Sequence, residues 1–374
     1  MIEYVEIRNE NRDLIGIIDT AESIIWETAY YSVGRFEIYV QANTRTVAML
    51  AVGNYVTRKD DDNIGHIESI NITYTPQSGR MIIASGRLAK SILDRRLIYN
   101  LSGTSISPSI SRGLVEVAVR KLVTDNIIAS NKAARNISFI KLGALQNINK
   151  QIMSESGETS QTQTSYGNLL EYTDSLLQTY GLGARLTLDR NTKNLLYGVY
   201  EGKDRSVGNT EGNAPVIFSQ DFDNLLSSEY KYDTAAFKTT ALIGGEGEGT
   251  ERFCVMVGDG AAGMNRREVF VDAASQSKKY KDDTDTEQTY TDAEYTEILQ
   301  NHGNQNLAQL LIVQTFNGEI DVLRSGYVYG KDFSVGDIVT INDSDLRAAI
   351  NTRILTATEV QDANGYMLSV TYGV

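Results

Sequence analysis

The chain begins and ends in short, strand-like apolar runs, and this arrangement constrains its fold more than any other feature. From Met1 to about Leu97, runs such as SIIWETAY and RFEIYVQA are separated by turn residues, and HIESINITYT with SGRMIIASG predicts a hairpin. Strand-like runs such as GDIVTIND and TRILTATEVQ return from Phe316 onward. Several short strands at close spacing indicate a small barrel or a sandwich, so the sequence predicts a β-rich α+β fold.

The middle of the chain carries helical patterns. In SRGLVEVAVRKLVTDNI the apolar residues recur at helical spacing, and Ser111 is a candidate N-terminal cap. Residues 164–180 repeat this pattern, and Gly181 follows where a glycine commonly ends a helix. The stretch ARLTLDRNTKNLLYGVYEG predicts two strands around a turn, and further strands are predicted at 227–237 and 239–244.

A third helix is predicted in YTDAEYTEILQNHGNQNLAQLL. Thr291 and Glu294 form a capping box at its start, and we expect an interruption or a bend near Gly303. Residues 147–164 are polar and predict a loop. Residues 275–289 are charged and almost free of apolar side chains, so they predict an exposed, mobile loop.

The size and charge of the chain limit its function. Its 374 residues suggest two to four domains at about 100–200 residues each, and its formal net charge is −13. A polyanion-binding surface needs clustered Lys and Arg, so we expect no sequence-specific nucleic-acid binding. The N-terminus has acidic residues where a signal peptide needs basic ones, and no run of about 18 uncharged apolar residues occurs. We therefore expect folding in the cytoplasm and no membrane insertion.

The run GGEGEGTERF, from Gly244 to Phe253, raises the question of a phosphate-binding loop. No Lys-Ser or Lys-Thr follows the glycines, and the next residues predict a strand, whereas a dinucleotide fingerprint needs a helix there. Glu246 and Glu248 would repel a phosphate. The run therefore predicts a tight hairpin turn whose glycines adopt positive φ angles, and no cofactor site.

Histidine and cysteine chemistry is scarce. The two histidines, His66 and His302, lie far apart in the sequence with no Cys neighbour, so no metal site is predicted. A Ser–His–Asp triad remains formally possible, but the chain has no G-x-S-x-G elbow. The single cysteine, Cys254, lies in an apolar run and is expected to be a small buried hydrophobe.

Carboxylates are plentiful, but their patterns do not predict a site. The acidic runs 59–63 and 281–287 suggest calcium, yet the second lacks the glycine and the bidentate glutamate of a calcium loop. We expect Asp282 and Asp285 to be solvated loop charges. A glycosidase pair of acids stays open, although the chain has one Trp and sugar clefts usually use aromatic platforms. The sequence thus supplies no catalytic, cofactor-binding or metal-binding residues to assign.

The most conspicuous aromatic cluster surrounds Trp26. Tyr30, Tyr31 and Phe36 stand close to it in the sequence. Aromatic side chains with a polar handle suit either a barrel core or a subunit interface, and both interpretations stay open.

Taken in order, several blocks of the sequence resemble one family, the siphovirus Gp37-like tail proteins of phages and prophages of mainly Gram-positive hosts. The blocks are DLIGIIDTAESIIWETAYYSVGRFEIYVQAN, YVTRKDDDNIGHIESI with IIASGRLAKSILDRRLI, LIGGEGEGTERFCVMVGDGAAGMNRREVFVDA, YVYGKDFSVGDIVTIN and TRILTATEVQDANGYMLSVTYG. The resemblance covers most of the chain. It implies a structural loop at the glycine-rich run, where Arg252, Arg266, Arg267 and Glu268 are expected to make local salt bridges or subunit contacts.

The resemblance also implies a fold. Proteins of the wider tail-hub group carry two barrel-like domains per chain, here with an inserted mixed α/β region. The first barrel-like domain would be residues 1–97, followed by an α/β domain at 98–226. Residues 227–243 and 316–374 would form the second barrel-like domain, and 244–315 would be an insertion.

The function that the resemblance implies is structural. Such hubs are homotrimers whose six barrel-like domains form a ring under a hexameric tail tube, at the virion tail tip or baseplate. The implied partners are a distal tail or tube protein, a tape-measure protein, and a tail fibre or receptor-binding protein. An acidic lumen would let DNA pass without binding.

Two other functions stay open at this point. Larger tail-tip proteins of related type continue into lytic or fibre domains, whereas this sequence stops at Val374. We therefore expect the hub role and not a peptidoglycan-degrading one. The alternatives are a tail-associated cell-wall hydrolase and a carbohydrate-binding module, for which the 21 tyrosines are the only argument.

Overall fold

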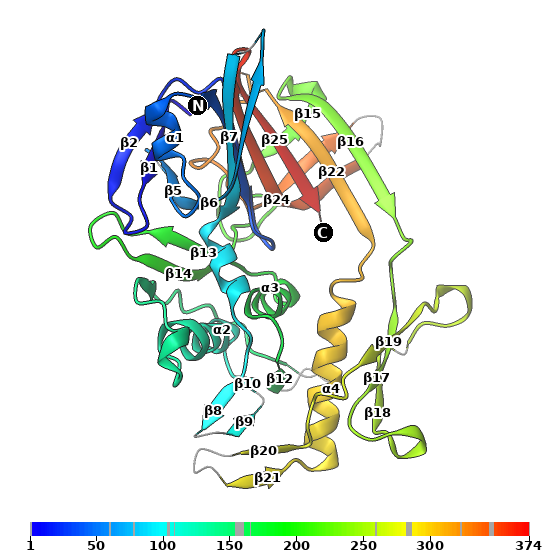
Figure 1. Cartoon of the computed structure of the whole chain (residues 1–374). Coiled ribbons are helices and arrows are strands. Elements are labelled where there is room, and N and C mark those ends of the chain that lie inside the picture. The colour runs from blue at the N-terminus through cyan, green and yellow to red at the C-terminus, as the bar shows by residue number, and fades with distance from the viewer. Residues whose placement is uncertain are drawn as a thin grey trace. The chain divides into compact units, whose positions relative to one another are not determined.

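The computed structural model of the chain falls into two compact units (Figure 1). Unit 1 is Met1–Ser91, Gly183–Tyr232 and Gln314–Val374, and unit 2 is Ile92–Leu182 and Asp233–Val313. The structure describes residues 2–59, 61–77, 79–102, 105–107, 109–153, 161–164, 166–258, 260–281, 286–321, 324–343 and 348–373. Strands outnumber helices in both units, which confirms the predicted β-rich α+β class.

The first part of unit 1 is an antiparallel array built from the N-terminal residues. Its strands are β1 (Val5–Arg8), β2 (Leu14–Ile18), β3 (Ser23–Ala29), β4 (Arg35–Gln41), β5 (Tyr55–Arg58), β6 (Asp61–Thr75) and β7 (Gly79–Leu88). The predicted hairpin is β6 with β7, in which Ile72 faces Ile82. The sequence analysis missed the short helix α1 (Thr44–Met49), which begins with a capping box between Asn43 and Thr46.

The rest of unit 1 continues the same sheet. Its strands are β13 (Gly183–Leu188), β14 (Leu195–Tyr200), β15 (Ile217–Ser219), β16 (Leu225–Asp233), β22 (Val313–Ile320), β23 (Ile338–Asp343), β24 (Ala348–Asp362) and β25 (Gly365–Gly373). Neighbouring strands follow the order β6-β7-β4-β3-β24-β25-β22-β16, and Figure 1 shows β25 beside β24. This path is open, and the described strands form no closed barrel.

Two hydrophobic cores lie on this sheet. The first gathers side chains from residues 2–88 and contains Trp26 stacked on Phe36, with ring centroids 5.7 Å apart. Trp26 is fully buried, which confirms the core interpretation of this residue. The second core gathers Tyr30 with side chains from residues 216–225 and 320–372. Tyr366 packs against both cores.

Unit 2 combines three helices with short strands. The helices are α2 (Val115–Val123), α3 (Leu169–Thr179) and α4 (Asp292–Leu307). A three-stranded sheet has β17 (Thr240–Gly244) between β18 (Cys254–Val257) and β19 (Glu268–Asp272), and α4 packs on one of its faces. The remaining strands are β8 (Asn100–Ser102), β9 (Ser105–Ser107), β10 (Ser109–Arg112), β11 (Ile140–Leu142), β12 (Gln161–Thr164), β20 (Lys279–Lys281) and β21 (Glu287–Thr289). No helix in the described part of the chain is both long and apolar enough to span a membrane.

The starts of the first two helices differ from the prediction. Ser111 is not a cap, because it lies in β10 and pairs with Thr162 of β12. Helix α2 begins after Leu114 without a side-chain cap, whereas α3 is capped by Asn168. The end of α3 is as predicted, since Gly181 follows the last turn with φ of +65°.

The bend predicted at Gly303 is wrong. Helix α4 runs without interruption through Gly303, and the predicted capping box of Thr291 and Glu294 is confirmed. A β-carbon at Gly303 would lie 2.5 Å from Ile243 Cδ1 and 2.9 Å from Val257 Cγ2. The glycine is therefore needed for close packing of the helix on β17 and β18, not for flexibility.

The two predicted polar loops contain paired strands. Residues 161–164 form β12, and 279–281 pair with 287–289 as β20 and β21. Residues 154–160, together with Asp282 and Asp285, lie outside the described residues. The mobility expected for 275–289 stays a prediction.

We predict that Gly303→Ala destabilises the protein by about 1–3 kcal/mol. Alanine is the better helix former by roughly 1 kcal/mol, but its methyl group would collide with buried, β-branched side chains that cannot easily turn away. Denaturant unfolding followed by circular dichroism measures the change. Asn304→Ala is the control, since it raises helix propensity on the same turn without entering this contact. A Gly303→Ala protein at least as stable as the original would contradict the packing explanation.

Candidate functional site

The glycine-rich run is a structural turn. Residues 245–253 connect β17 to β18, and Gly244 faces Cys254 in their antiparallel pairing. Gly247 and Gly249 have the predicted positive φ angles, at +100° and +56°. The connection 245–253 is longer than a tight hairpin turn and contains a 3-10 segment at Gly249–Glu251. The turn is closed by the N–H of Phe253, which donates to the carbonyl of Glu246 at 2.9 Å.

The charged side chains beside this turn pair locally. Arg252 forms an ion pair with Asp272 and donates to the carbonyl of Gly244 at 3.0 Å. Arg266 donates to Glu268 at 2.6 Å. The predicted local salt bridges are thus present for Arg252, Arg266 and Glu268, whereas Arg267 donates to the backbone carbonyl of Thr234. A role in subunit contacts stays a prediction.

The burial predicted for Cys254 is wrong. Cys254 is exposed, and so are Leu242, Met256 and Phe270, which lie across the three strands in register. Because side chains alternate along a strand, these residues face away from α4, and only the other face of the sheet is a core. The apolar run around Cys254 does not by itself indicate which of its residues face the core.

The two histidines do not form a site. His66 lies in β6 with its ring 5.2 Å from that of Tyr55, and His302 lies in α4, where burial lowers its pKa. They belong to different units. Among the described residues, no group of three or more His, Cys, Asp or Glu is arranged to hold a metal ion.

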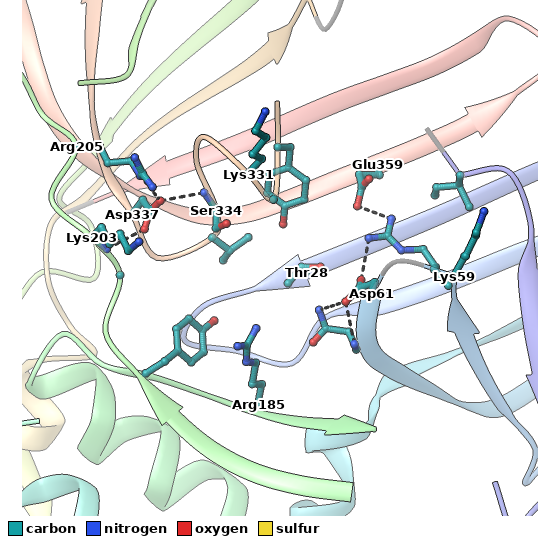
Figure 2. Close-up of a pocket in the computed structure, with 18 of the residues that line it drawn as sticks. Thr28, Lys59, Asp61, Arg185, Lys203, Arg205, Lys331, Ser334, Asp337 and Glu359 are labelled. Carbon is teal, nitrogen blue, oxygen red and sulfur yellow. Dashed lines mark hydrogen bonds and ion pairs between the residues drawn. The ribbon is translucent and has the colours of Figure 1, made fainter. Parts of the chain in front are cut away.

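The feature of unit 1 with the most concentrated chemistry is a polar cavity of about 690 Å³ (Figure 2). Its lining comes from both ends of the chain and from the β13–β14 hairpin with the loop that follows it. Two glycines allow the loop after β14 to approach the turn before β23, since a β-carbon at Gly202 would lie 1.8 Å from the carbonyl oxygen of Gly336. Tyr30 braces this contact, because its hydroxyl accepts a hydrogen bond from the N–H of Gly202 at 3.1 Å.

One side of the cavity is an ion network centred on Arg58. Its guanidinium donates to Glu359 at 2.6 Å and to Asp61 at 2.8 Å. Glu359 also accepts from the hydroxyl of Tyr366 at 2.8 Å, and burial together with this carboxylate raises the pKa of Tyr366. Burial opposes the charge of Arg58, but its two carboxylate partners outweigh that effect and its pKa is raised. The sequence analysis weighed the acidic run 59–63 as a calcium loop; Asp60 lies outside the described residues, and Asp61 instead serves this network.

The other side of the cavity is organised by the buried carboxylate of Asp337. Arg205 donates to it at 3.0 Å, and the backbone N–H groups of Lys203 and Ser334 donate at 2.8 and 3.0 Å (Figure 2). Three donors satisfy a buried carboxylate that would otherwise be costly. These contacts fix the backbone that carries Lys203.

Three cationic side chains of the cavity have no carboxylate partner among the described residues. Lys203 and Lys331 are exposed at the cavity, and Arg185 lies with its guanidinium 5.0 Å from the centre of the Tyr200 ring. Lys59 is only weakly paired, at 4.0 Å from Glu3. The cavity therefore contains positive charge that the protein itself does not neutralise.

The cavity resembles a binding site more than a catalytic one. The residues that line it include neither His nor Cys, and Asp61, Asp337 and Glu359 are each occupied by arginine. Burial raises the pKa of Tyr329 well above its ordinary value, so this phenol stays neutral and is no base. None of these residues carries a motif, and the sequence analysis missed the cavity because its lining converges only in the folded chain.

A second network holds the β13–β14 hairpin against the same strands. Arg190, in the turn of the hairpin, donates to Glu6 at 2.7 Å and to the carbonyl of Asp61 at 3.2 Å. Glu6 also accepts from Arg8 at 2.6 Å. Burial alone would raise the pKa of Glu6, but the hydrogen bonds from Arg8, Arg190 and Thr57 outweigh it and lower the pKa.

The fold is one seen in phage and prophage tail proteins. The tail protein from Neisseria meningitidis MC58 aligns with a TM-score of 0.54 at 13% identity, covering 99% of this chain and 96% of that one. The prophage MuSo2 43 kDa tail protein from Shewanella oneidensis gives a TM-score of 0.53 at 10% identity, covering 99% and 98%. Prophage tail protein gp18 from Listeria monocytogenes EGD-e gives 0.51 at 11% identity, covering 98% and 94%.

The sequence identifies the family within this class. Residues 4–374 match the family described as Siphovirus ReqiPepy6 Gp37-like protein, so the chain belongs to that family. The predicted resemblance is thereby confirmed. The comparison with curated proteins finds no match.

We predict that the Glu6 network makes stability depend on pH. Because the folded-state pKa of Glu6 is lowered, its contribution is complete above the ordinary glutamate pKa and is lost as pH falls through the folded value. Glu6→Gln should lower the unfolding free energy near pH 6 and should flatten its decline below about pH 4.5. Denaturant unfolding across this range measures both effects. Glu22→Gln, at an exposed glutamate of the same unit, should change neither, and an unchanged profile for Glu6→Gln would contradict the assignment.

Proposed function

We propose that this chain is a structural tail-tip or baseplate hub protein, three copies of which form a ring that closes the hexameric tail tube. The ring would anchor tail-tip or receptor-binding components at the end of the virion tail. Family membership and the tail-protein fold support a structural role and not an enzymatic one. The expected neighbours are a distal tail or tube protein, a tape-measure protein, and a tail fibre or receptor-binding protein.

The observation that carries the proposal is the run of eight strands from β6 to β16. Among the described strands, β16 lies at one edge of the sheet, and only the first half of β6 pairs onward with β5 and β13. Residues 71–75 of β6 pair only with β7, and β16 has only β22 as a neighbour, among the described strands. Each edge carries exposed apolar side chains, which are Ile72 and Tyr74 on β6 and Leu226, Tyr230 and Tyr232 on β16. An unpaired strand is a template for pairing with another chain. Two different edges on one molecule favour a head-to-tail contact, and such contacts make a ring when the rotation closes.

The two cores support a chain with two similar halves. We propose that residues 1–97 form the first barrel-like hub domain, and that 227–243 with 316–374 form the second. The first core lies within the first of these ranges, and most of the second core lies within the last. Residues 98–226 and 244–315 would be the inserted α/β region and the insertion with the glycine-rich turn.

The charge of the chain suits a conduit for DNA. With a formal net charge of −13, a ring of three copies would carry a strongly acidic surface. An acidic lumen repels phosphate groups and would let DNA slide through during ejection. A structure of the ring with its lysines and arginines lining the channel would overturn this part of the proposal.

The first test is the mass and shape of the purified chain. Light scattering should give about three times 41.3 kDa, and negative-stain images of the same fraction should show six lobes around a hole. Tyr230→Lys with Tyr232→Lys should leave a folded monomer, because edge lysines block strand pairing. Val207→Lys, at an exposed valine of the loop after β14, should assemble normally. A chain that stays monomeric would favour the cell-wall hydrolase, and cell-wall digestion would then be assayed.

A further inference from the structure

The polar cavity of unit 1 is more basic than the chain that contains it. Among the described residues, its lining has six cationic and five anionic side chains, whereas the whole chain has a formal net charge of −13. The cationic residues are Arg58, Lys59, Arg185, Lys203, Arg205 and Lys331, and the anionic ones are Glu3, Asp61, Glu201, Asp337 and Glu359. A positive site in an acidic protein concentrates anionic ligands near it.

The internal ion pairs leave the remaining cations free for a ligand. Arg58 alone serves two carboxylates, Asp61 and Glu359, and Arg205 serves Asp337. These contacts are partly buried and hold the walls of the cavity in place. Arg185, Lys203 and Lys331 have no carboxylate partner among the described residues, and Figure 2 shows them on separate segments around the cavity.

We propose that this cavity binds an acidic segment of a partner protein, whose carboxylates pair with Lys203, Lys331 and Arg185. The cavity of about 690 Å³ lies within the range of sites that take a drug-sized ligand or a few side chains. The rings of Tyr200 and Tyr329 supply apolar area for the backbone of such a segment.

The mixed charge of the lining favours a peptide over a nucleic acid. A phosphate backbone presents continuous negative charge, which Glu3 and Glu201 at this cavity would repel. A peptide spaces its carboxylates and can place neutral or basic residues near these glutamates. The identification of the partner as another tail component rests on the proposed function. The acidic chemistry of the ligand rests only on the residues that line the cavity.

The test uses as the probe a fluorescein-labelled peptide in which glutamate alternates with serine, because the proposed ligand spaces its carboxylates. The full-length chain is the receptor, and fluorescence anisotropy is the readout. We expect saturable binding that weakens as salt rises. Lys203→Gln with Lys331→Gln should weaken binding at least about fivefold, since each partly exposed ion pair contributes modestly. Lys132→Gln with Lys141→Gln removes two exposed lysines of unit 2 and should leave the affinity within about twofold.

Three outcomes would overturn the proposal. They are the absence of saturable binding, an equal loss of affinity in the two double variants, and displacement of the probe by tripolyphosphate at lower concentration than by the unlabelled peptide. The last outcome would assign the cavity to phosphate chemistry. The circular dichroism spectra and unfolding midpoints of both variants should match those of the original chain, because all four lysines are exposed. Failure of peptide binding would not contradict the proposed trimeric ring, because trimer formation is tested separately by the mass of the chain in solution.

Discussion

The pairing of β3 with β24 is the contact on which unit 1 depends. It joins residues 23–29 to residues 356–362 in continuous antiparallel register and so makes one sheet from two distant parts of the chain. The joint contains a buried charge, because Glu359 lies opposite Trp26 at the centre of this register. A buried carboxylate is costly unless it is paired and hydrogen-bonded, and Arg58 with Tyr366 meets both needs. A shift in register would separate these groups, so the ion network favours one alignment of the two strands.

Tyr30 connects the β3–β24 pairing to the cavity. It follows β3 directly, its ring is fully buried in the second core, and burial raises the pKa of its phenol to about 12. A β-carbon at Gly336 would lie 2.4 Å from this ring, and Gly336 has φ of +98°, a conformation that favours glycine. The position of Lys203 is therefore set by the Tyr30 side chain, by Gly202 and Gly336, and by Asp337. The geometry of the cavity therefore depends on the pairing of β3 with β24 and not only on the conformations of the loops that line it.

Local patterns explain which elements could be predicted. The capping box of α4, the glycine after α3 and the β6–β7 hairpin depend on residues close in sequence, and all three appear in the structure. The errors at Ser111, Gly303 and Cys254 have tertiary causes. Ser111 pairs with Thr162, far away in the sequence, Gly303 lies where a helix packs on a sheet, and Cys254 lies on the exposed face of that sheet. The cavity was invisible for the same reason, since Arg58, Lys203, Lys331 and Glu359 have no common motif. Its recognition requires knowing that β3 pairs with β24.

The distribution of arginine links the fold to the function. Arg8, Arg58, Arg190 and Arg205 are committed to carboxylates inside unit 1, where they hold strands and turns together. Arg8 and Arg190 share one acid, Arg58 pairs with two and Arg205 with one, so these networks are close to neutral and the excess negative charge of the chain lies on residues outside them. An acidic exterior keeps DNA and other polyanions from binding. Under the two proposals above, the cavity cations without a carboxylate partner among the described residues would recognise an acidic partner, while the acidic exterior would still let DNA pass.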